Sequence, residues 1–383
     1  MKQIIIGLSL LLLIACSNHK RGNQITKNPL DQLQSSDFKT IIEGKATDLY
    51  FLQNANGAKA AITNYGGRIV GLTVPDQYGN PVDVVIGMKS VDAYRKATEP
   101  YFGALIGRVG NRIAKGQFSL DGKSYELYLN NGPNSLHGGN KGFQYVVWDA
   151  VQLNDSTLTL NYLSKDGEEN YPGNLKVSVT YRLNATNGLE ISYTWQSDAR
   201  TVANLTNHAF FNLNGEGSGS INDHYLTINA DKYTPVDATL IPTGELTSVK
   251  ETPFDFTKGS TIGARLDTTT NEQLKFGKGY DHNYRLNKLE GKLEWAAKII
   301  GDKTGIIMDV YTTEPGLQFY GGNFMQSKNT LKYGEKDHFR TAFCLETQHF
   351  PDAPNQAHFP SIVVEPQQVY SSQTIYQFSA KPQ

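Results

Sequence analysis

The chain has 383 residues with 36 basic and 37 acidic side chains, which gives a formal net charge of −1. This balance argues against a nucleic-acid binder, which would carry a basic excess. With 39% hydrophobic and 19% charged residues, the chain can bury a core and is not a disordered sequence. Its two cysteines exclude a disulfide scaffold and a four-cysteine metal site.

The first 15 residues have the pattern of a secretory signal. Lys2 supplies a positive charge, and the apolar run 4–14 is too short to span a bilayer comfortably. The run ends in Leu13-Ile14-Ala15-Cys16-Ser17, which resembles the bacterial lipobox, where the chain is cut before the cysteine and lipid is attached to its sulfur. We therefore expect residues 1–15 to be a lipoprotein signal peptide and Cys16 to be lipidated. An ordinary signal peptide cut nearby is the alternative.

Lipid on Cys16 would anchor the protein in the membrane of a bacterial cell envelope. The next residue is Ser17 rather than Asp, which favours the outer membrane in a Gram-negative cell. Residues 16–40 are polar and show no periodicity, so they are predicted to form a flexible tether. Lipidation would also leave Cys344 without a partner for an intramolecular disulfide.

From residue 41 onward the hydrophobic period is two, which is typical of half-buried strands in antiparallel sheets. The clearest alternation covers residues 158–162, 175–183 and 189–195. Turn signals lie at 76–80, 121–122, 187–188 and 315–316. Helical signals are few, and residues 91–96 are expected to make about two turns. We see no internal repeat or linker, so residues 41–383 are predicted to be a single all-β domain, a large antiparallel β-sandwich.

Three histidines and one glutamate lie in unusual settings. His137 lies in a turn-rich loop, His208 lies where polar residues lead into aromatic ones, and His282 follows Asp281. Glu346 lies in an apolar strand, where alternation puts Leu345 on the opposite face. A charge there is costly unless it is paired or functional. Each residue alone also fits a structural role, because a lone histidine is usually hydrogen-bonded and a lone strand glutamate usually pairs with a cation.

Six motifs together resemble the aldose 1-epimerase (galactose mutarotase) family, in that family's order and at its approximate spacing. They are residues 102–116, 134–139, 206–213, 280–284, 314–320 and 343–348. Each motif alone is weak, but the set covers essentially the whole chain from residue 45 to residue 380. A lipoprotein leader is unusual beside this resemblance, since many mutarotases are cytoplasmic.

The resemblance implies a large β-sandwich with sugar bound in an open cleft, and interconversion of the α and β anomers of free aldohexoses such as galactose and glucose. Glu346 resembles the general base at the C1 hydroxyl, His208 the general acid at the ring oxygen, and His137 an assisting group. Four further residues resemble the groups with which the family holds the sugar: Asn111, Arg112, Asp281 and Gln318. No cofactor or metal is implied. We expect a monomer whose partners are a free monosaccharide and, through the lipid, a membrane, with no nucleic acid.

The chemistry can be judged without the resemblance. Opening a hemiacetal requires one proton to leave O1 while another reaches O5, so a carboxylate and an imidazole suffice. Each positioned acid or base contributes about 10²- to 10⁴-fold. A glutamate with its ordinary pKa of about 4.3 is ionised at neutral pH, so Glu346 is expected to be ready as a base. His208 can be the protonated partner if a carboxylate or a hydrogen bond favours the cation.

Other functions remain open from the residues alone. Asp281 and Glu346 could form the carboxylate pair of a glycoside hydrolase. The sandwich could also be a non-catalytic sugar-binding lipoprotein. A phosphorylated sugar would need a basic cluster, and only Arg108 lies near Arg112 in the motifs. A metal enzyme would use His137 with His208 and the two carboxylates, although no His-x-x-x-His spacing supports it.

Three aromatic residues near the motifs allow two interpretations. They could stack on the apolar face of a pyranose, or they could belong to the hydrophobic core. The residues are Trp148, Phe210 and Tyr280.

Overall fold

The computed structural model describes residues 27–266 and 270–381. Within these ranges the only α-helices are α1 (Val91–Lys96) and α2 (Glu272–Gly277). Helix α1 matches the predicted helix and is capped by Ser90, whose hydroxyl accepts a hydrogen bond from the Ala93 N–H (3.0 Å). The sequence analysis missed α2. No helix among the described residues is long and apolar enough to cross a membrane.

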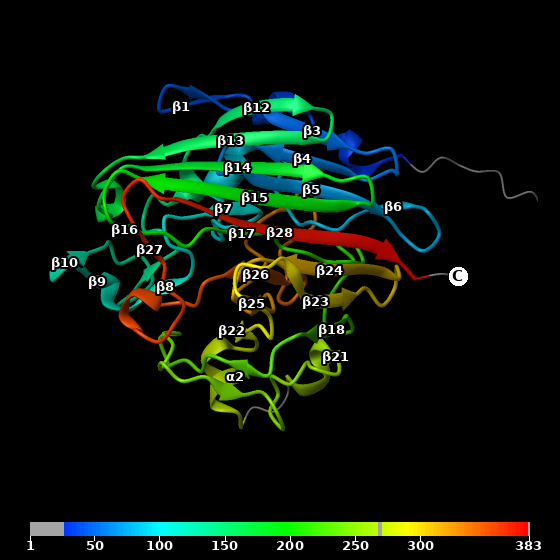
Figure 1. Cartoon of the computed structure of the whole chain (residues 1–383). Coiled ribbons are helices and arrows are strands. Elements are labelled where there is room, and N and C mark those ends of the chain that lie inside the picture. The colour runs from blue at the N-terminus through cyan, green and yellow to red at the C-terminus, as the bar shows by residue number, and fades with distance from the viewer. Residues whose placement is uncertain (1–26, 267–269, 382–383) are drawn as a thin grey trace, which may run out of the picture.

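The largest sheet has nine strands, and its long members run across the molecule in Figure 1. Its order from edge to edge is β12 (Asp149–Asn154), β13 (Thr157–Ser164), β14 (Leu175–Leu183), β15 (Gly188–Ser197), β28 (Val369–Ala380), β24 (Ile306–Thr312), β23 (Glu294–Ile300), β18 (Tyr225–Ile228) and β21 (Ser260–Thr261). All neighbouring strands are antiparallel. Val179 of β14 lies opposite Tyr193 of β15, and both are buried, as the alternation predicts.

A five-stranded antiparallel sheet carries part of the candidate site. Its order is β20 (Thr247–Ser248), β19 (Lys232–Tyr233), β22 (Asp281–Arg285), β25 (Gly316–Tyr320) and β26 (Cys344–Gln348). A four-stranded sheet contains β3 (Leu49–Gln53), β4 (Lys59–Thr63), β5 (Arg68–Pro75) and β6 (Pro81–Asp83).

Short strand pairs complete the described fold. They are β1 (Ile41–Ile42) with β2 (Lys45–Ala46), β7 (Ala104–Ile106) with β17 (Thr206–His208), β8 (Arg112–Ile113) with β11 (Ser135–Leu136), β9 (Gln117–Leu120) with β10 (Lys123–Glu126), and β16 (Thr201–Val202) with β27 (Val363–Val364).

The main core lies between the nine-stranded sheet and the apolar face of β25 and β26. Phe319 and Leu345 belong to the same buried cluster as the inward residues of β14 and β15. Tyr376 of β28 reaches across and donates its hydroxyl hydrogen to the Leu345 carbonyl (2.8 Å). The all-β antiparallel sandwich is therefore confirmed. Because strands alternate, Cys344 and Glu346 lie on the face of β26 that points away from this core.

The tether predicted for residues 16–40 is too long at its C-terminal end. Two 3₁₀-helices, Pro29–Gln32 and Ser35–Phe38, precede β1, and the side chains of Leu30 and Phe38 are fully buried. Their apolar residues are too widely spaced to give a periodic signal, yet they pack into a cluster with β4 and β5. The described segment before residue 41 therefore belongs to the domain.

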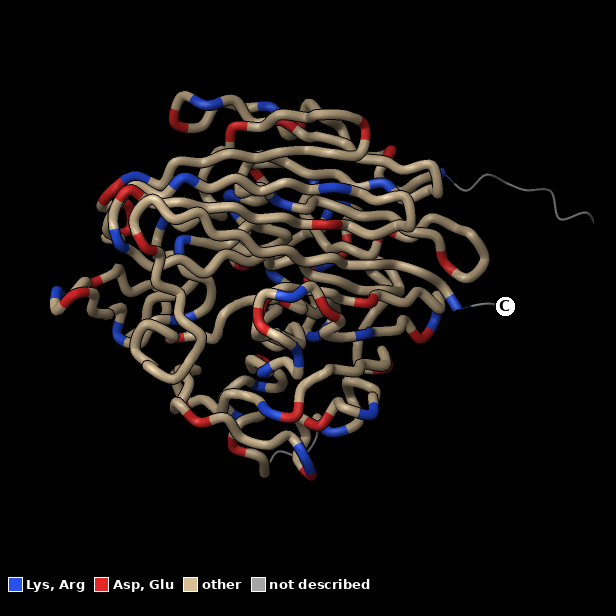
Figure 2. Tube along the Cα trace, in the orientation of Figure 1, with Lys and Arg blue, Asp and Glu red and all other residues tan. Residues whose placement is uncertain are grey.

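Acidic and basic residues are interspersed along the chain in Figure 2. Several of the ion pairs between described residues are exposed on both sides. A buried network differs: Lys332 Nζ lies 3.2 Å from Asp83 Oδ2 and 2.8 Å from Glu216 Oε2, with all three side chains almost fully buried. Such a network needs both partners, because removing one leaves an uncompensated buried charge.

Candidate active site

A cleft of about 740 Å³ brings together residues that are far apart in the chain. All the sequence-predicted catalytic and sugar-holding residues except Gln318 line it. They are Asn111, Arg112, His137, His208, Asp281 and Glu346.

Strand pairing explains how two of these residues meet. His208 ends β17, and the chain continues to Phe211, which exchanges backbone hydrogen bonds with Phe343 (2.8 and 2.9 Å). Phe343 immediately precedes β26, whose third residue is Glu346. The pairing therefore places the His208 imidazole beside the Glu346 carboxyl, with 3.6 Å between Nε2 and Oε1.

His208 and Glu346 are both buried, at 6% and 2% exposure. The His208 ring stacks on Phe210 and on Tyr101, with centroid distances of 4.9 and 5.6 Å. Its Nδ1 lies 3.4 Å from the Cys344 sulfur. Glu346 Oε2 has no hydrogen-bond partner among the described residues. A buried carboxylate oxygen of this kind is costly unless a ligand satisfies it.

His137 is held by a reciprocal contact with Asn111. The His137 backbone N–H donates to the Asn111 carbonyl (3.0 Å), and the Asn111 N–H donates to His137 Nδ1 (3.2 Å). Because Nδ1 accepts a hydrogen bond, the neutral ring carries its proton on Nε2. Both residues have positive φ, and the next residue, Gly138, has φ +85° with no room for a Cβ beside the Gly107 carbonyl.

The sugar-holding candidates are ordered by neighbours. Arg112 Nε donates to Asn131 Oδ1 (3.1 Å), and the Gln318 amide donates to Asp281 Oδ1 (2.7 Å). Gln318 lies opposite Glu346 in the β25–β26 register, but its side chain is not part of the cleft lining. Gln318 therefore orients the Asp281 carboxyl group from outside the cleft lining.

Burial changes the charge states expected for the pair. It raises the pKa of Glu346 well above its ordinary value, and Asp281 and Glu99 add to this, while Arg112 opposes it. Burial also lowers the pKa of His208 to about 3. Both pKa directions oppose the ionised glutamate and the protonated histidine that the ordinary pKa values predict. Although the two groups lie at ion-pair distance, these directions favour a neutral pair that shares one proton, on the Glu346 carboxyl.

The ligand atoms of His137, His208 and Glu346 lie within 4.8 Å of one another, which is close enough for one metal ion. A histidine binds metal through a nitrogen lone pair. His137 Nδ1 already accepts the Asn111 N–H, and its Nε2 then carries a proton. This tautomer favours proton transfer over metal binding at His137.

Sequence reasoning missed cleft residues in the loop before the 102–116 motif. Glu99 and Tyr101 line the cleft, and Phe324 lines it from the segment after β25. Burial raises the pKa of Glu99 to about 7, with Asp337 and Asp281 adding to the effect. The loop has no periodicity, and only its position next to a motif could have pointed to it.

The aromatic residues for which two interpretations were open belong to the core. Trp148, Phe210 and Tyr280 are at most 1% exposed and do not line the cleft. Arg108 is also buried, and its guanidinium donates to the carbonyls of Ser164 and Pro172. It is therefore not available to hold a phosphate.

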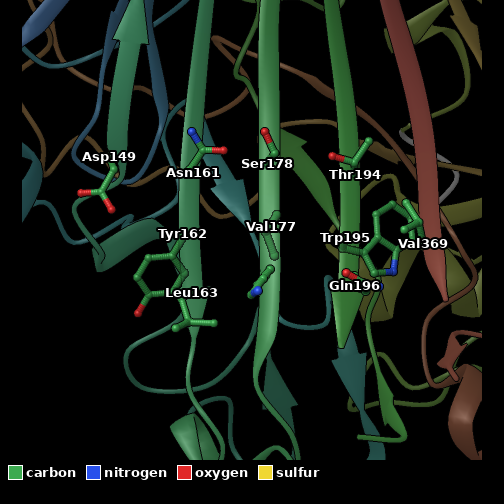
Figure 3. A pocket seen from close by; sticks show the side chains of 11 residues that line it. Asp149, Asn161, Tyr162, Leu163, Val177, Ser178, Thr194, Trp195, Gln196 and Val369 are labelled. Atoms are coloured by element: carbon green, nitrogen blue, oxygen red, sulfur yellow. The ribbon is translucent and has the colours of Figure 1, made fainter. Parts of the chain in front are cut away.

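A second hollow, of about 450 Å³, lies on the nine-stranded sheet across β12–β15 and β28 (Figure 3). Asp149 and Lys176 are the only charged residues of its described lining, and Asp149 is paired with Lys45. The rest are hydroxyl, amide, aromatic and aliphatic side chains such as Thr194 and Val369. This lining offers no acid–base pair, so the chemistry belongs to the first cleft.

Comparison with known proteins agrees with this geometry. The model of the family described as Aldose 1-epimerase matches residues 48–377. The galactose mutarotase of pig is 43% identical over 344 residues, covering 90% of this chain and 98% of the relative. The galactose mutarotase of human is 43% identical over 343 residues, covering 89% and 97%.

The expected location in a bacterial cell envelope is wrong. Relatives that are 43–44% identical over about nine tenths of the chain include the galactose mutarotases of pig, cattle and human, which are not proteins of a bacterial envelope. The signal peptide of residues 1–15 and the lipidation of Cys16 lie outside the described residues.

The fold leads to the same family as the sequence. A solved aldose epimerase homologue from C. elegans superposes with a TM-score of 0.80 at 30% identity, covering 88% of this chain and 99% of that one. The family match, the relatives and the fold extend over most of the chain. The chain belongs to the aldose 1-epimerase family.

Proposed function

We propose that this protein is an isomerase that interconverts the α and β anomers of free aldoses such as galactose and glucose. The relatives are named galactose mutarotase, and the family is described as Aldose 1-epimerase. The cleft supplies what the reaction needs, which is a carboxyl and an imidazole beside each other and hydrogen-bonding groups around them.

The roles of the residues follow from the reaction. Glu346 takes the proton from the C1 hydroxyl, and His208 delivers a proton from Nε2 to the ring oxygen O5. Rotation about C1–C2 and reversal of both transfers close the ring as the other anomer. His137 presents its Nε2–H to the oxygen on which charge develops, which stabilises the transition state.

The shared proton supports this assignment. Moving it from Glu346 Oε1 to His208 Nε2 produces the base and the acid together, without a change in the charge of the pair. The distance of 3.6 Å is longer than a hydrogen bond, and catalytic contacts often shorten when the substrate is bound. The two forms are isoprotonic, so the pair acts as one unit with pKa values of its own.

The sugar is held by groups that match its hydroxyls. Arg112 offers a planar fork of donors, Asp281 offers acceptors, and Asn111 offers both kinds. Gln318 contributes through Asp281, to which it donates. We also propose that the protein is a monomer. Lipid attachment at Cys16, after removal of residues 1–15, stays a prediction that labelling with palmitate can test against Cys16→Ala.

The observation that carries the proposal is a buried carboxyl that faces an imidazole in the cleft and has one oxygen without a hydrogen-bond partner among the described residues. Polarimetry of freshly dissolved α-galactose tests it. We expect the protein to speed the approach to the equilibrium rotation without changing the end point. Sugar binding without a faster rate would instead indicate a binding protein, and release of reducing ends from glycosides would indicate a hydrolase.

Glu346→Gln is the sharpest variant. The amide keeps the shape of the carboxyl but cannot take a proton, so we expect kcat to fall by at least about 100-fold while galactose still binds. Polarimetry gives the rate, and calorimetric titration gives the binding. Glu190→Gln is the matched control, because Glu190 is a buried carboxyl on β15 that pairs with Arg182 outside the cleft. A Glu346→Gln enzyme with the full rate would remove Glu346 from the chemistry.

A further inference from the structure

The Cys344 side chain is not explained by the reaction described above. It is a free cysteine, fully buried, on the same face of β26 as Glu346. Side chains two residues apart on a strand share a face. His208 lies against both: Nδ1 is 3.4 Å from the Cys344 sulfur, and Nε2 is 3.6 Å from Glu346 Oε1.

The faces and edges of the His208 ring have different neighbours. Phe210 and Tyr101 stack on the ring, so they fix its plane without touching its proton. The proton is therefore governed by the groups at the two nitrogens. Among the described residues, the acceptors within reach of Nδ1 are both neutral: the Cys344 sulfur and the carbonyl of His208 itself.

A neutral imidazole carries one N–H and one lone pair, and each tautomer has different chemistry. With the N–H on Nδ1, the lone pair of Nε2 faces Glu346 and can receive the shared proton. With the N–H on Nε2, that transfer is blocked. The arrangement of the acceptors around Nδ1 thus decides whether the pair can work.

We propose that Cys344 is a positioning residue that accepts the His208 Nδ1–H and so keeps the Nε2 lone pair directed at Glu346. A carboxylate at this position would also hold the Nδ1–H, but it would stabilise the imidazolium. A thiol is neutral and a weak acceptor. It therefore fixes the tautomer while leaving the imidazolium a strong acid, which suits delivery of a proton to O5. This role depends on the proposed function of His208, but the tautomer itself does not.

The tautomer can be measured directly on the wild-type protein. Nitrogen-15 NMR of protein labelled at histidine separates protonated from unprotonated ring nitrogens, and the His208→Asn variant identifies the His208 signals by their absence. We expect a protonated Nδ1 and an unprotonated Nε2 at neutral pH. A proton on Nε2 would overturn the proposal. This readout stands even if polarimetry finds no mutarotation, so a failure of the proposed function would be recognised separately.

Two substitutions separate the hydrogen bond from packing. Cys344→Ser keeps an acceptor at Nδ1, so we expect kcat within about twofold of wild type. Cys344→Val fills the space but removes the sulfur acceptor and leaves only the His208 carbonyl at Nδ1, so we expect kcat to fall about five- to tenfold, the equivalent of one hydrogen bond, with KM within about twofold. A Val variant with the wild-type kcat and His208 spectrum would show that the sulfur only fills space. Thermal unfolding of both variants confirms that they fold.

Discussion

Glu99 is a third carboxyl in the cleft that contains Glu346 and Asp281. Its negative charge, when present, is one cause of the raised pKa of Glu346. The active pair is the form with one proton, so activity should fall as rising pH removes that proton from the pair. We call this fall on the alkaline side of the pH–activity profile the alkaline limb. The pH at which it occurs reports the raised pKa of Glu346.

We expect Glu99→Gln to move the alkaline limb to lower pH. Removing a like charge lowers the pKa of Glu346, so the pair loses its last proton earlier. The measurement is kcat by polarimetry over the pH range, with Glu190→Gln as the control that leaves the limb in place. An unchanged limb in Glu99→Gln would mean that Glu99 does not act on the pair.

Arg112 is expected to affect binding more than turnover. It lines the cleft and holds a fixed orientation through Asn131, but it is not part of the proton-transfer pair. A hydrogen bond from a charged donor contributes about 1.5–3 kcal/mol, so Arg112→Ala should raise KM about 10- to 100-fold. Steady-state polarimetry separates KM from kcat. A loss confined to kcat would contradict a role in holding the sugar.

At the scale of single residues, the sequence predicted which residues line the cleft better than it predicted their charge states. The alternation around Glu346 showed its face correctly, because strand geometry is local. The charge states of Glu346 and His208 could not be predicted, because they depend on burial by segments distant in the chain. Glu99 was missed for the same reason: a loop residue acquires its role only when the loop folds over the cleft.

Among the secondary-structure elements, β25 and β26 are fastened at one end by an ion pair. Glu314 precedes β25 and His349 follows β26, with 2.6 Å between Oε2 and Nδ1. Burial alone would lower the pKa of His349, but Glu314 outweighs it and raises the pKa above the ordinary value. These strands carry Gln318 and Glu346. The Glu314–His349 ion pair therefore supports the register between β25 and β26 beside the cleft.

The contribution of this pair to stability should depend on pH. Because the pKa of His349 is raised in the folded protein, its stabilisation is complete below the unfolded pKa of about 6.5 and is lost as pH rises through the folded pKa. We expect His349→Asn to lower the free energy of unfolding by about 1–3 kcal/mol at acidic pH and by less at alkaline pH.

Urea unfolding at about pH 5 and about pH 9 measures the difference on either side of the ordinary histidine pKa. The exposed His338→Asn is the control. A destabilisation that is equal at both pH values would show that the ion pair contributes nothing.

Local patterns predicted local elements well. Strands β13, β14 and β15 followed from alternation, and helix α1 from helical signals within its own segment. The placement of β28 between β15 and β24 could not be predicted, since nothing in its own residues specifies distant partners. The segment of Leu30 and Phe38 was assigned to a tether because so few apolar residues give no period, although they suffice to hold it on the domain.

For the molecule as a whole, every group that takes part in the proposed reaction is a side chain of the protein itself. We expect dialysis against EDTA to leave the mutarotation rate of the purified protein unchanged, because the His137 tautomer does not suit a metal ion. Polarimetry before and after dialysis, with metal analysis of the protein, measures this. A lost rate that zinc restores would show that the cluster of His137, His208 and Glu346 binds a metal.

The central position of β28 has a consequence for biosynthesis. The largest sheet cannot be completed until this strand, Val369–Ala380, has been inserted between β15 and β24, which are both made earlier. In a nascent polypeptide the sheet therefore stays incomplete until this strand has been translated, with the edges of β15 and β24 open to chaperones in the meantime. Premature stop codons anywhere before this strand should yield polypeptides that are degraded rather than enzymes of reduced activity.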